Sequence, residues 1–218
     1  MRLTPFLIAA TACGFLFATE TVKTPIDNDD VRVLDVVVQP HEKGHMHEHK
    51  PNRVILYRNA GALDVEFEGG KKSVLKFKDN QVIWTPGGGA HSSTVSTDKP
   101  VGIVEIELKK PGAGKKVTTE LDTLKVDPKH YKLEFENDQV RVIRVRFGAH
   151  DGAPLHEHQL NRIMLYLTNS KTRVTSADGK VDETPHKAGE ILQGGPARHS
   201  EINTLDHAIE VIVVELKY

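Results

Sequence analysis

The sequence has 218 residues, enough for one large domain or two small ones. Its 29 basic and 30 acidic residues leave a formal net charge of −1, which gives no support to a nucleic-acid-binding face or a polybasic membrane patch. The 17 glycines and 11 prolines suit a turn-rich all-β protein. Four of the 12 histidines fall between His41 and His49, and histidine is the commonest protein ligand for transition metals.

The chain begins with a short basic start and an apolar stretch from Pro5 to Ala18, which predicts a secretory signal peptide over residues 1–21. Cleavage after Ala18, cleavage after Ala12 and lipidation at Cys13 are three open alternatives. A membrane anchor is disfavoured, because a span needs roughly 20 apolar residues. We therefore expect a secreted or periplasmic protein that has no membrane span and no cysteine once the signal peptide is removed.

Strands and turns dominate the rest of the chain. Partly alternating, β-branched runs predict strands at 31–38, 62–68, 81–84, 102–108, 140–147 and 209–216. A hairpin turn is predicted at Gly69-Gly70, which follows the second of these runs. The stretch from Lys110 is rich in Gly and Lys and reads as a linker with a strand at 117–124.

The chain repeats itself at an offset of 109 residues. Val31-Arg-Val33 matches Val140-Arg-Val142, and His47-Glu-His49 matches His156-Glu-His158. The offset later slips by one residue, where Glu107-Leu-Lys109 matches Glu215-Leu-Lys217. Two collinear copies indicate duplication of a whole domain, which predicts two all-β domains at 22–110 and 129–218 joined by a linker at 111–128.

Each copy contains a His-x-His pair and a later histidine. In a strand, residues i and i+2 point to the same face, so His47 with His49, and His156 with His158, project together. A third histidine, His91 or His199, follows a Gly- and Pro-containing turn that brings it towards the pair. The pattern predicts one three-histidine site per copy for a divalent transition metal.

These motifs resemble those of the cupin superfamily. The residues that match are Gly44, His47, His49, Pro86, Gly88 and His91 in the first copy, and Gly152, His156, His158, Gly194, Pro196, His199 and Asn203 in the second. The resemblance covers both copies and implies two tandem double-stranded β-helix (jelly-roll) barrels, that is, a bicupin. It also implies that the three histidines of each copy are the metal ligands.

One departure from the cupin pattern concerns the first motif, where many cupins have a glutamate ligand. Arg53 and Arg162 stand four residues after the second histidine of each pair, and guanidinium cannot ligate a metal. Both arginines share the inward strand parity of that histidine, and a nearby anion would offset their charge. They are predicted either to bind a substrate anion or to form an ion pair across the barrel, with Glu48 or Glu157 as candidate partners.

Two tyrosines share the same parity, Tyr57 and Tyr166. Each is predicted to contact a ligand or to pack in the core. Trp84 is predicted to line the first pocket, and its counterpart Gln193 would make the second pocket more polar. The remaining histidines, His130, His186 and His207 among them, are interpreted as surface residues.

Two functions fit this pattern. The first is a metal-dependent oxygenase, lyase or isomerase that acts on a small anionic or enolisable substrate, with Fe, Mn, Ni, Cu or Zn admissible as the metal. The resemblance includes three-histidine dioxygenases but does not assign that chemistry, and no catalytic acid or base stands out. The alternative is a non-catalytic binding or storage bicupin. Expected partners are a small-molecule ligand and, as one option, a second copy of the chain.

Overall fold

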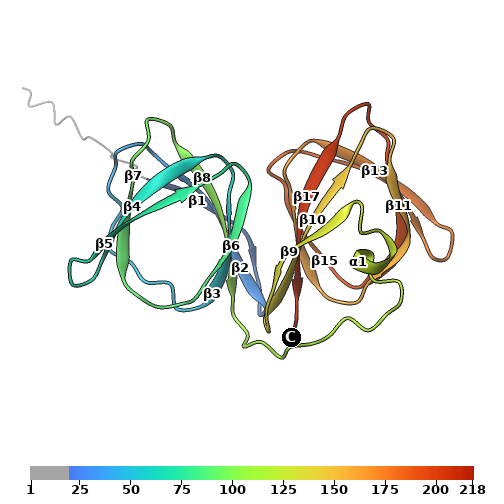
Figure 1. The fold of residues 1–218 in the computed structure, drawn as a ribbon, viewed down its shortest axis with the longest axis horizontal. Coiled ribbons are helices and arrows are strands. Elements are labelled where there is room, and N and C mark those ends of the chain that lie inside the picture. Colours follow the sequence, from blue (N-terminus) through green and yellow to red (C-terminus); the bar gives the residue numbers. More distant parts are fainter. Residues whose placement is uncertain (1–19) are drawn as a thin grey trace, which may run out of the picture.

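The computed structural model describes residues 20–218, so nearly all of the predicted signal peptide, including Cys13, lies outside the described residues. The described residues form two β-barrels that lie side by side, with the connecting segment running below them in Figure 1. No helix among them is long and apolar enough to cross a membrane. The predicted all-β fold of two jelly-roll barrels is confirmed.

Eight strands build the N-terminal barrel, on the left in Figure 1. They are β1 (Glu20–Asp27), β2 (Val31–Val38), β3 (Asn52–Tyr57), β4 (Gly61–Phe67), β5 (Lys72–Phe77), β6 (Gln81–Thr85), β7 (His91–Val95) and β8 (Val101–Leu108). A five-stranded sheet has the order β1-β2-β8-β3-β6, and a three-stranded sheet has the order β5-β4-β7. All pairings between these strands are antiparallel.

Nine strands build the C-terminal barrel. They are β9 (Tyr131–Glu136), β10 (Val140–Phe147), β11 (Gly152–His158), β12 (Arg162–Tyr166), β13 (Ser170–Ser176), β14 (Val181–His186), β15 (Ile191–Gly194), β16 (Ala197–Asn203) and β17 (Ile209–Leu216). Its sheets have the orders β15-β12-β17-β10-β9 and β11-β16-β13-β14. The order of the larger sheet repeats that of the N-terminal barrel, as expected for duplicated domains.

The two five-stranded sheets are apolar on both faces, and the reason lies in how the barrels pack. In β10, Val140 and Val142 join a cluster that is shared between the barrels, whereas Ile143 and Val145 fill the interior of their own barrel. The shared cluster includes Val31, Val54 and Ile106 from the N-terminal barrel, and all three are fully buried. Strands buried on both faces read as nearly continuous apolar runs, which explains the imperfect alternation in the sequence.

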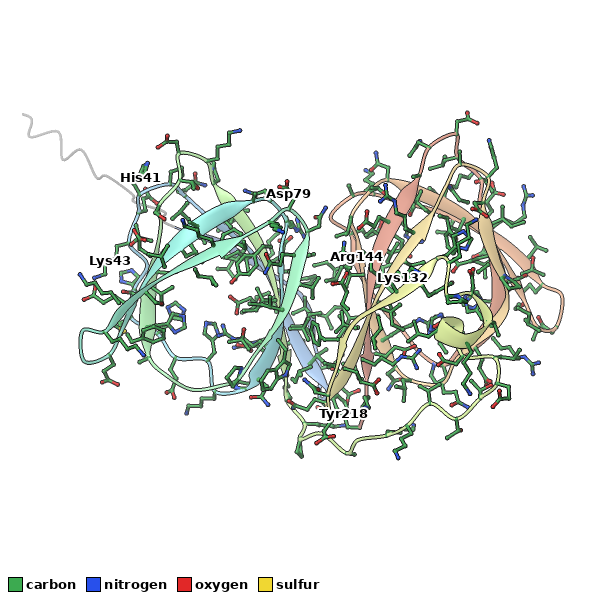
Figure 2. All side chains as sticks on the ribbon, viewed as in Figure 1. His41, Lys43, Asp79, Lys132, Arg144 and Tyr218 are labelled. Carbon is green, nitrogen blue, oxygen red and sulfur yellow. The ribbon has the colours of Figure 1, made fainter. Side chains whose placement is uncertain are left out.

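Polar contacts reinforce this packing at the edge of the shared cluster. The Tyr218 hydroxyl donates to the carbonyl of Asp30 at 3.0 Å, and Arg144 donates to the carbonyl of Asn80 at 2.8 Å. Figure 2 shows Tyr218 at the bottom, where the two barrels meet, and Arg144 on the side of the C-terminal barrel that faces its neighbour. The barrels therefore contact each other through both apolar and hydrogen-bonding groups.

The first His-x-His pair does not lie on the expected strand, although its two rings still come together. Residues 41–50 contain no β-branched residue and no Phe, Tyr or Trp, the residue types that favour strands. The segment pairs with β7 only through isolated bridges, such as the one between His47 and His91. Its counterpart in the C-terminal barrel is the regular strand β11.

The strand predicted at 117–124 is also absent from the described residues. A short helix, α1 (Thr123–Val126), occupies the end of this segment. Asp122 and Thr123 are buried there, and the backbone N–H of Glu157 donates to the carbonyl of Leu121 at 2.8 Å. The end of the connecting segment is thus docked on the C-terminal barrel beside β11.

Candidate metal centres

The N-terminal triad gathers His47, His49 and His91 at the mouth of the first barrel. One ring nitrogen from each lies within 4.8 Å of the others. His47 and His91 face each other across a bridge in which each backbone N–H donates to the other's carbonyl at 2.9 Å. His47 is exposed, and the other two histidines are half-buried.

The C-terminal triad gathers His156, His158 and His199 with the same spacing, within 4.8 Å of one another. His156 and His158 lie on one face of β11, and His199 stands directly opposite His156 on the neighbouring strand β16. All three are buried, with exposed fractions of 0%, 5% and 9% in sequence order. The structure therefore brings together all six predicted histidines, in two groups of three.

Hydrogen bonds orient the N-terminal rings. Nδ1 of His47 donates to the carbonyl of His45 at 2.8 Å, and Nδ1 of His91 donates to that of Gly89 at 3.1 Å. Nδ1 of His49 faces a carboxylate oxygen of Glu107 at 3.3 Å. An Nδ1 proton held in this way leaves the lone pair on Nε2, the tautomer in which histidine ligates a metal.

The C-terminal rings are held in a similar way. Nδ1 of His156 donates to the carbonyl of Pro154 at 2.9 Å, and Nδ1 of His158 donates to Glu215 at 2.9 Å. Imidazoles whose ring nitrogens lie this close together, with two of the three rings held through Nδ1, suit a divalent transition metal. The residues of both triads therefore fit the predicted metal.

Sequence analysis missed the two carboxylates behind these rings. Glu107, which contacts His49, is bound by Arg32 at 2.6 Å, and Glu215, which contacts His158, lies 3.4 Å from Arg141. Both carboxylates are nearly fully buried. The signal was present in the repeat, because the matched segments contain Glu107 with Glu215 and Arg32 with Arg141 at corresponding positions.

The two predicted anion-binding arginines are both buried in the barrels. Arg53 lines the cavity beside the N-terminal triad and donates to Glu105 at 2.8 Å, so its ion-pair partner is Glu105 and not Glu48. Arg162 lines the cavity beside the C-terminal triad and donates to the carbonyl of Gly195. Glu105 has no acidic counterpart, since Val213 occupies the repeated position.

The two predicted tyrosines also line these cavities. Tyr57 stacks on Phe77 with ring centroids 3.9 Å apart, and Tyr166 stacks on His186 at 4.2 Å. Burial raises the pKa of Tyr57 to about 12, so the phenol keeps its proton at neutral pH. Trp84, predicted to line the first pocket, is instead exposed and does not belong to the cavity wall.

A second missed pair lies beside the C-terminal triad. The Tyr131 hydroxyl donates to Glu201 at 2.6 Å and lies 3.2 Å from Nε2 of His156. Glu201 follows His199 by two residues on β16, and its carboxylate comes within 3.9 Å of His156. The N-terminal barrel has Ser93 and Val22 at the repeated positions. The two sites therefore differ in the polar groups around the same three histidines.

The interpretation of His130 as a surface residue is wrong. Its ring is buried and bound on both sides, to Asp127 at 2.7 Å through Nδ1 and to Asp151 at 2.9 Å through Nε2. These contacts join the end of the connecting segment to the loop before β11. His130 is therefore part of the packing that holds α1 on the barrel, not of either triad.

The cavities next to the triads differ in size. The N-terminal cavity has a volume of about 310 Å³ and is lined by the triad, by Arg53 and Glu105, and by apolar side chains from both sheets. The C-terminal cavity has a volume of about 70 Å³. Only the N-terminal triad therefore adjoins a space of the size usual for small-molecule pockets, roughly 300 Å³ or more.

We expect the metal-free chain to lose stability as the pH falls below about 6.5. Burial, together with the neighbouring His156, His158 and Arg162, lowers the pKa of His199 from 6.5 to about 3 in the folded chain. Between these values the unfolded chain binds a proton that the folded chain does not. The free energy of unfolding is therefore highest above about 6.5 and declines towards acid pH.

Thermal unfolding of the metal-free chain at about pH 7 and about pH 5 measures this decline. The same comparison on His199→Gln, which has no titrating group at this position, should show a smaller decline. An identical decline in the two proteins would show that His199 is not the group responsible.

Comparisons with known proteins support the fold. No protein-family description and no curated protein matches the chain by sequence. Among solved structures, AerE from Microcystis aeruginosa is 12% identical, with a TM-score of 0.68 over 93% of this chain and 94% of AerE. A cupin 2 conserved barrel protein from Leptotrichia buccalis is 13% identical, with a TM-score of 0.57 over 92% of this chain and 90% of its own.

Oxalate decarboxylase from Bacillus subtilis is a further structural neighbour. It is 12% identical to this chain, with a TM-score of 0.62 over 90% of this chain and 72% of the enzyme. Another structure of that enzyme, studied for its Mn(II) centres, has a TM-score of 0.58 at 11% identity over 86% of this chain and 69% of its own. At these identities the similarity establishes the fold, and with the repeated barrels it shows that this chain has the cupin fold in tandem, the architecture of a bicupin.

Proposed function

We propose that this chain is a metal-dependent enzyme whose reaction centre is the N-terminal triad, and that its substrate is a small anionic or enolisable molecule. One observation carries the proposal: a solvent-accessible group of three oriented histidines opens onto a cavity of about 310 Å³. A divalent transition metal held there would act as a Lewis acid on an oxygen of the substrate or take part in oxygenase chemistry. Imidazole ligands admit Fe, Mn, Ni, Cu and Zn, and the Mn(II) centres of the neighbouring decarboxylase support a metal of this group.

The residues around this centre have separate tasks. His47, His49 and His91 would hold the metal, and Glu107 fixes the orientation of the His49 ring. Arg53 and Glu105 lie side by side in the cavity wall, where together they add no net charge. The guanidinium of Arg53 lines the cavity, and its Nε atom is buried without a hydrogen-bond partner.

We assign the C-terminal triad a structural role. Its histidines are buried, and the adjoining cavity is small and partly closed by the Tyr131–Glu201 pair. A metal bound by buried ligands from two strands stabilises the folded state, because the unfolded chain offers no preformed site. Export of the protein and a secreted or periplasmic location are also part of the proposal, on the basis of the apolar segment in residues 1–21.

Metal content per chain tests the proposed centres. We expect about two metal ions per wild-type chain, and about one in each of the variants His47→Ala/His49→Ala and His156→Ala/His158→Ala. Oxygen-consumption and product assays with small carboxylates and enolisable ketones should then show turnover in the wild type and none in the His47→Ala/His49→Ala variant. Elemental analysis of protein purified without added metal, and again after reconstitution, provides the measurement.

The same experiment can reject the proposal. If the wild type holds no stoichiometric metal after reconstitution, the enzyme proposal fails and a non-catalytic binding bicupin remains. If metal is bound but only the His156→Ala/His158→Ala variant loses turnover, the reaction centre lies in the C-terminal barrel instead.

A further inference from the structure

The N-terminal barrel is hollow where the C-terminal barrel is filled. The cavities measure about 310 Å³ and about 70 Å³, although both are built from the same repeated fold. Protein interiors are normally close-packed, and a large void forfeits the dispersion contacts of its lining. The filled barrel shows that this fold packs well without a hollow. The N-terminal space is therefore large enough to admit a ligand, which would supply those contacts.

The β4–β5 part of the wall, which lies in the same sheet as His91, differs in chemistry between the barrels. On β4, Leu63, Val65 and Phe67 lie at alternate positions on the face that lines the cavity. Leu75 on β5 pairs directly with Leu63 and also lines the cavity. This wall of the cavity is thus mostly apolar, with Ser73 on β5 as its polar member, and is formed by two neighbouring strands.

In the C-terminal barrel three of the four repeated positions are polar, and the fourth, the counterpart of Val65, is Val174. Thr172 and Thr184 form the cross-strand pair that corresponds to Leu63 and Leu75. Ser176 corresponds to Phe67. Because the backbone pairing is the same in both barrels, the apolar wall of the N-terminal cavity is a property of its side chains and not of the fold.

Polar groups gather at one end of the N-terminal cavity. The triad lies there with the Arg53–Glu105 pair, whose charges offset each other at 2.8 Å. A ligand with one oxygen-donor head satisfies this end, while a second charged group would point at the apolar wall or at the Glu105 carboxylate. Burying a charge without a partner is strongly unfavourable.

We propose that the N-terminal cavity binds a molecule of about the size of a substituted aromatic ring, with one oxygen-donor head at the triad and an apolar body against the β4–β5 wall. This inference rests on the proposed function, because the head is placed by the metal centre. It goes further in excluding small dianions as the preferred ligand class and in assigning Leu63, Val65, Phe67 and Leu75 to substrate selection.

Three hydroxamates with the same metal-binding head test the inference. Acetohydroxamate has almost no apolar body, benzohydroxamate has an aromatic ring, and 4-carboxybenzohydroxamate carries a charge at the far end of that ring. Calorimetric titration of the metal-loaded full chain should show benzohydroxamate binding at least about tenfold more tightly than acetohydroxamate, because about fourfold is gained for each buried methylene equivalent. The 4-carboxy compound should lose that gain.

The variant Leu63→Thr/Leu75→Thr gives the N-terminal barrel the threonine pair of its neighbour. It should keep its metal and its acetohydroxamate affinity, and should lose most of the preference for benzohydroxamate. Leu133→Thr, at an exposed position on β9 outside both cavities, is the matched control and should retain the full preference. Thermal unfolding and metal content establish that each variant is folded.

The outcomes separate this inference from the proposed function. If the chain binds metal but shows equal affinity for acetohydroxamate and benzohydroxamate, the apolar ligand class is wrong and the metal centre stands. A preference that survives in Leu63→Thr/Leu75→Thr would likewise overturn the assignment of the β4–β5 wall. A chain without metal at the N-terminal triad overturns the proposed function and this inference together.

Discussion

Replacing Arg141 with methionine is expected to lower the free energy of unfolding by about 3–5 kcal/mol. The Arg141 guanidinium is buried between two carboxylates, hydrogen-bonded to Asp122 and 3.4 Å from Glu215. Asp122 belongs to the connecting segment and Glu215 to β17, so this cation joins the segment to the barrel. Methionine fills similar space but removes the cation from two buried carboxylates, of which Glu215 keeps its hydrogen bond from His158, and uncompensated buried charge is the costly outcome.

Chemical denaturation of the metal-free protein measures the loss. The control is Arg173→Met in the same barrel, where the Arg173 side chain is 53% exposed and pairs with Glu183 at 2.9 Å. A solvent-exposed pair contributes about 1 kcal/mol or less, so this control should unfold almost as the wild type does. Similar losses in the two variants would mean that burial of the Arg141 cluster has no special energetic weight.

Replacing Glu107 with glutamine is expected to weaken metal binding at the N-terminal triad by about 10- to 100-fold. The carboxylate of Glu107 lies 3.3 Å from Nδ1 of His49 and holds that ring in its ligating tautomer. Although burial opposes ionisation, hydrogen bonds from Arg32 and His49 lower the pKa of Glu107, so the group is an anion at neutral pH. A carboxylate that accepts the Nδ1 proton of His49 makes this ring a stronger metal ligand than the neutral amide of glutamine does.

Competition with a chromogenic chelator gives the affinity of each site, and the variant His156→Ala/His158→Ala identifies which signal belongs to the N-terminal triad. The matched control is Glu66→Gln in the same barrel, because Glu66 pairs with Lys43 at 2.6 Å on the surface and contacts no triad histidine. This control should bind metal as the wild type does. Unchanged affinity in Glu107→Gln would show that the carboxylate does not tune the site.

The repeat allowed much of the site to be predicted from the sequence. Two copies of His-x-His, each with one later histidine, predicted two groups of three. The structure brings the three histidines of each copy together. That these groups hold a metal stays a prediction. The repeat also contained Glu107 with Glu215. Nothing in the sequence indicated that these carboxylates lie behind histidines 58 and 57 residues away, because each contact forms only when β8 or β17 closes the barrel.

Local sequence was a poorer guide to elements and partners. The irregular segment at 41–50 and the helix α1 replaced two expected strands. The first contains no residue type that favours strands, and the second is held by contacts to the C-terminal barrel. The partner of Arg53 was misjudged for a related reason. Strand parity gives the side of the sheet on which a residue lies, but not which residue of another strand stands opposite.

The sequence by itself determined the class of the fold, the duplication and which six histidines form the two groups of three. Strand periodicity and repeated motifs can be recognised in the sequence without knowing how the side chains pack. Only the tertiary structure decided that the N-terminal cavity is large, with polar groups at one end and a mostly apolar β4–β5 wall, and that the C-terminal cavity is small. Cavity volume depends on how side chains from several strands fill a shared interior, and Leu63, Thr172 and their neighbours acquire this meaning only once the barrels are closed.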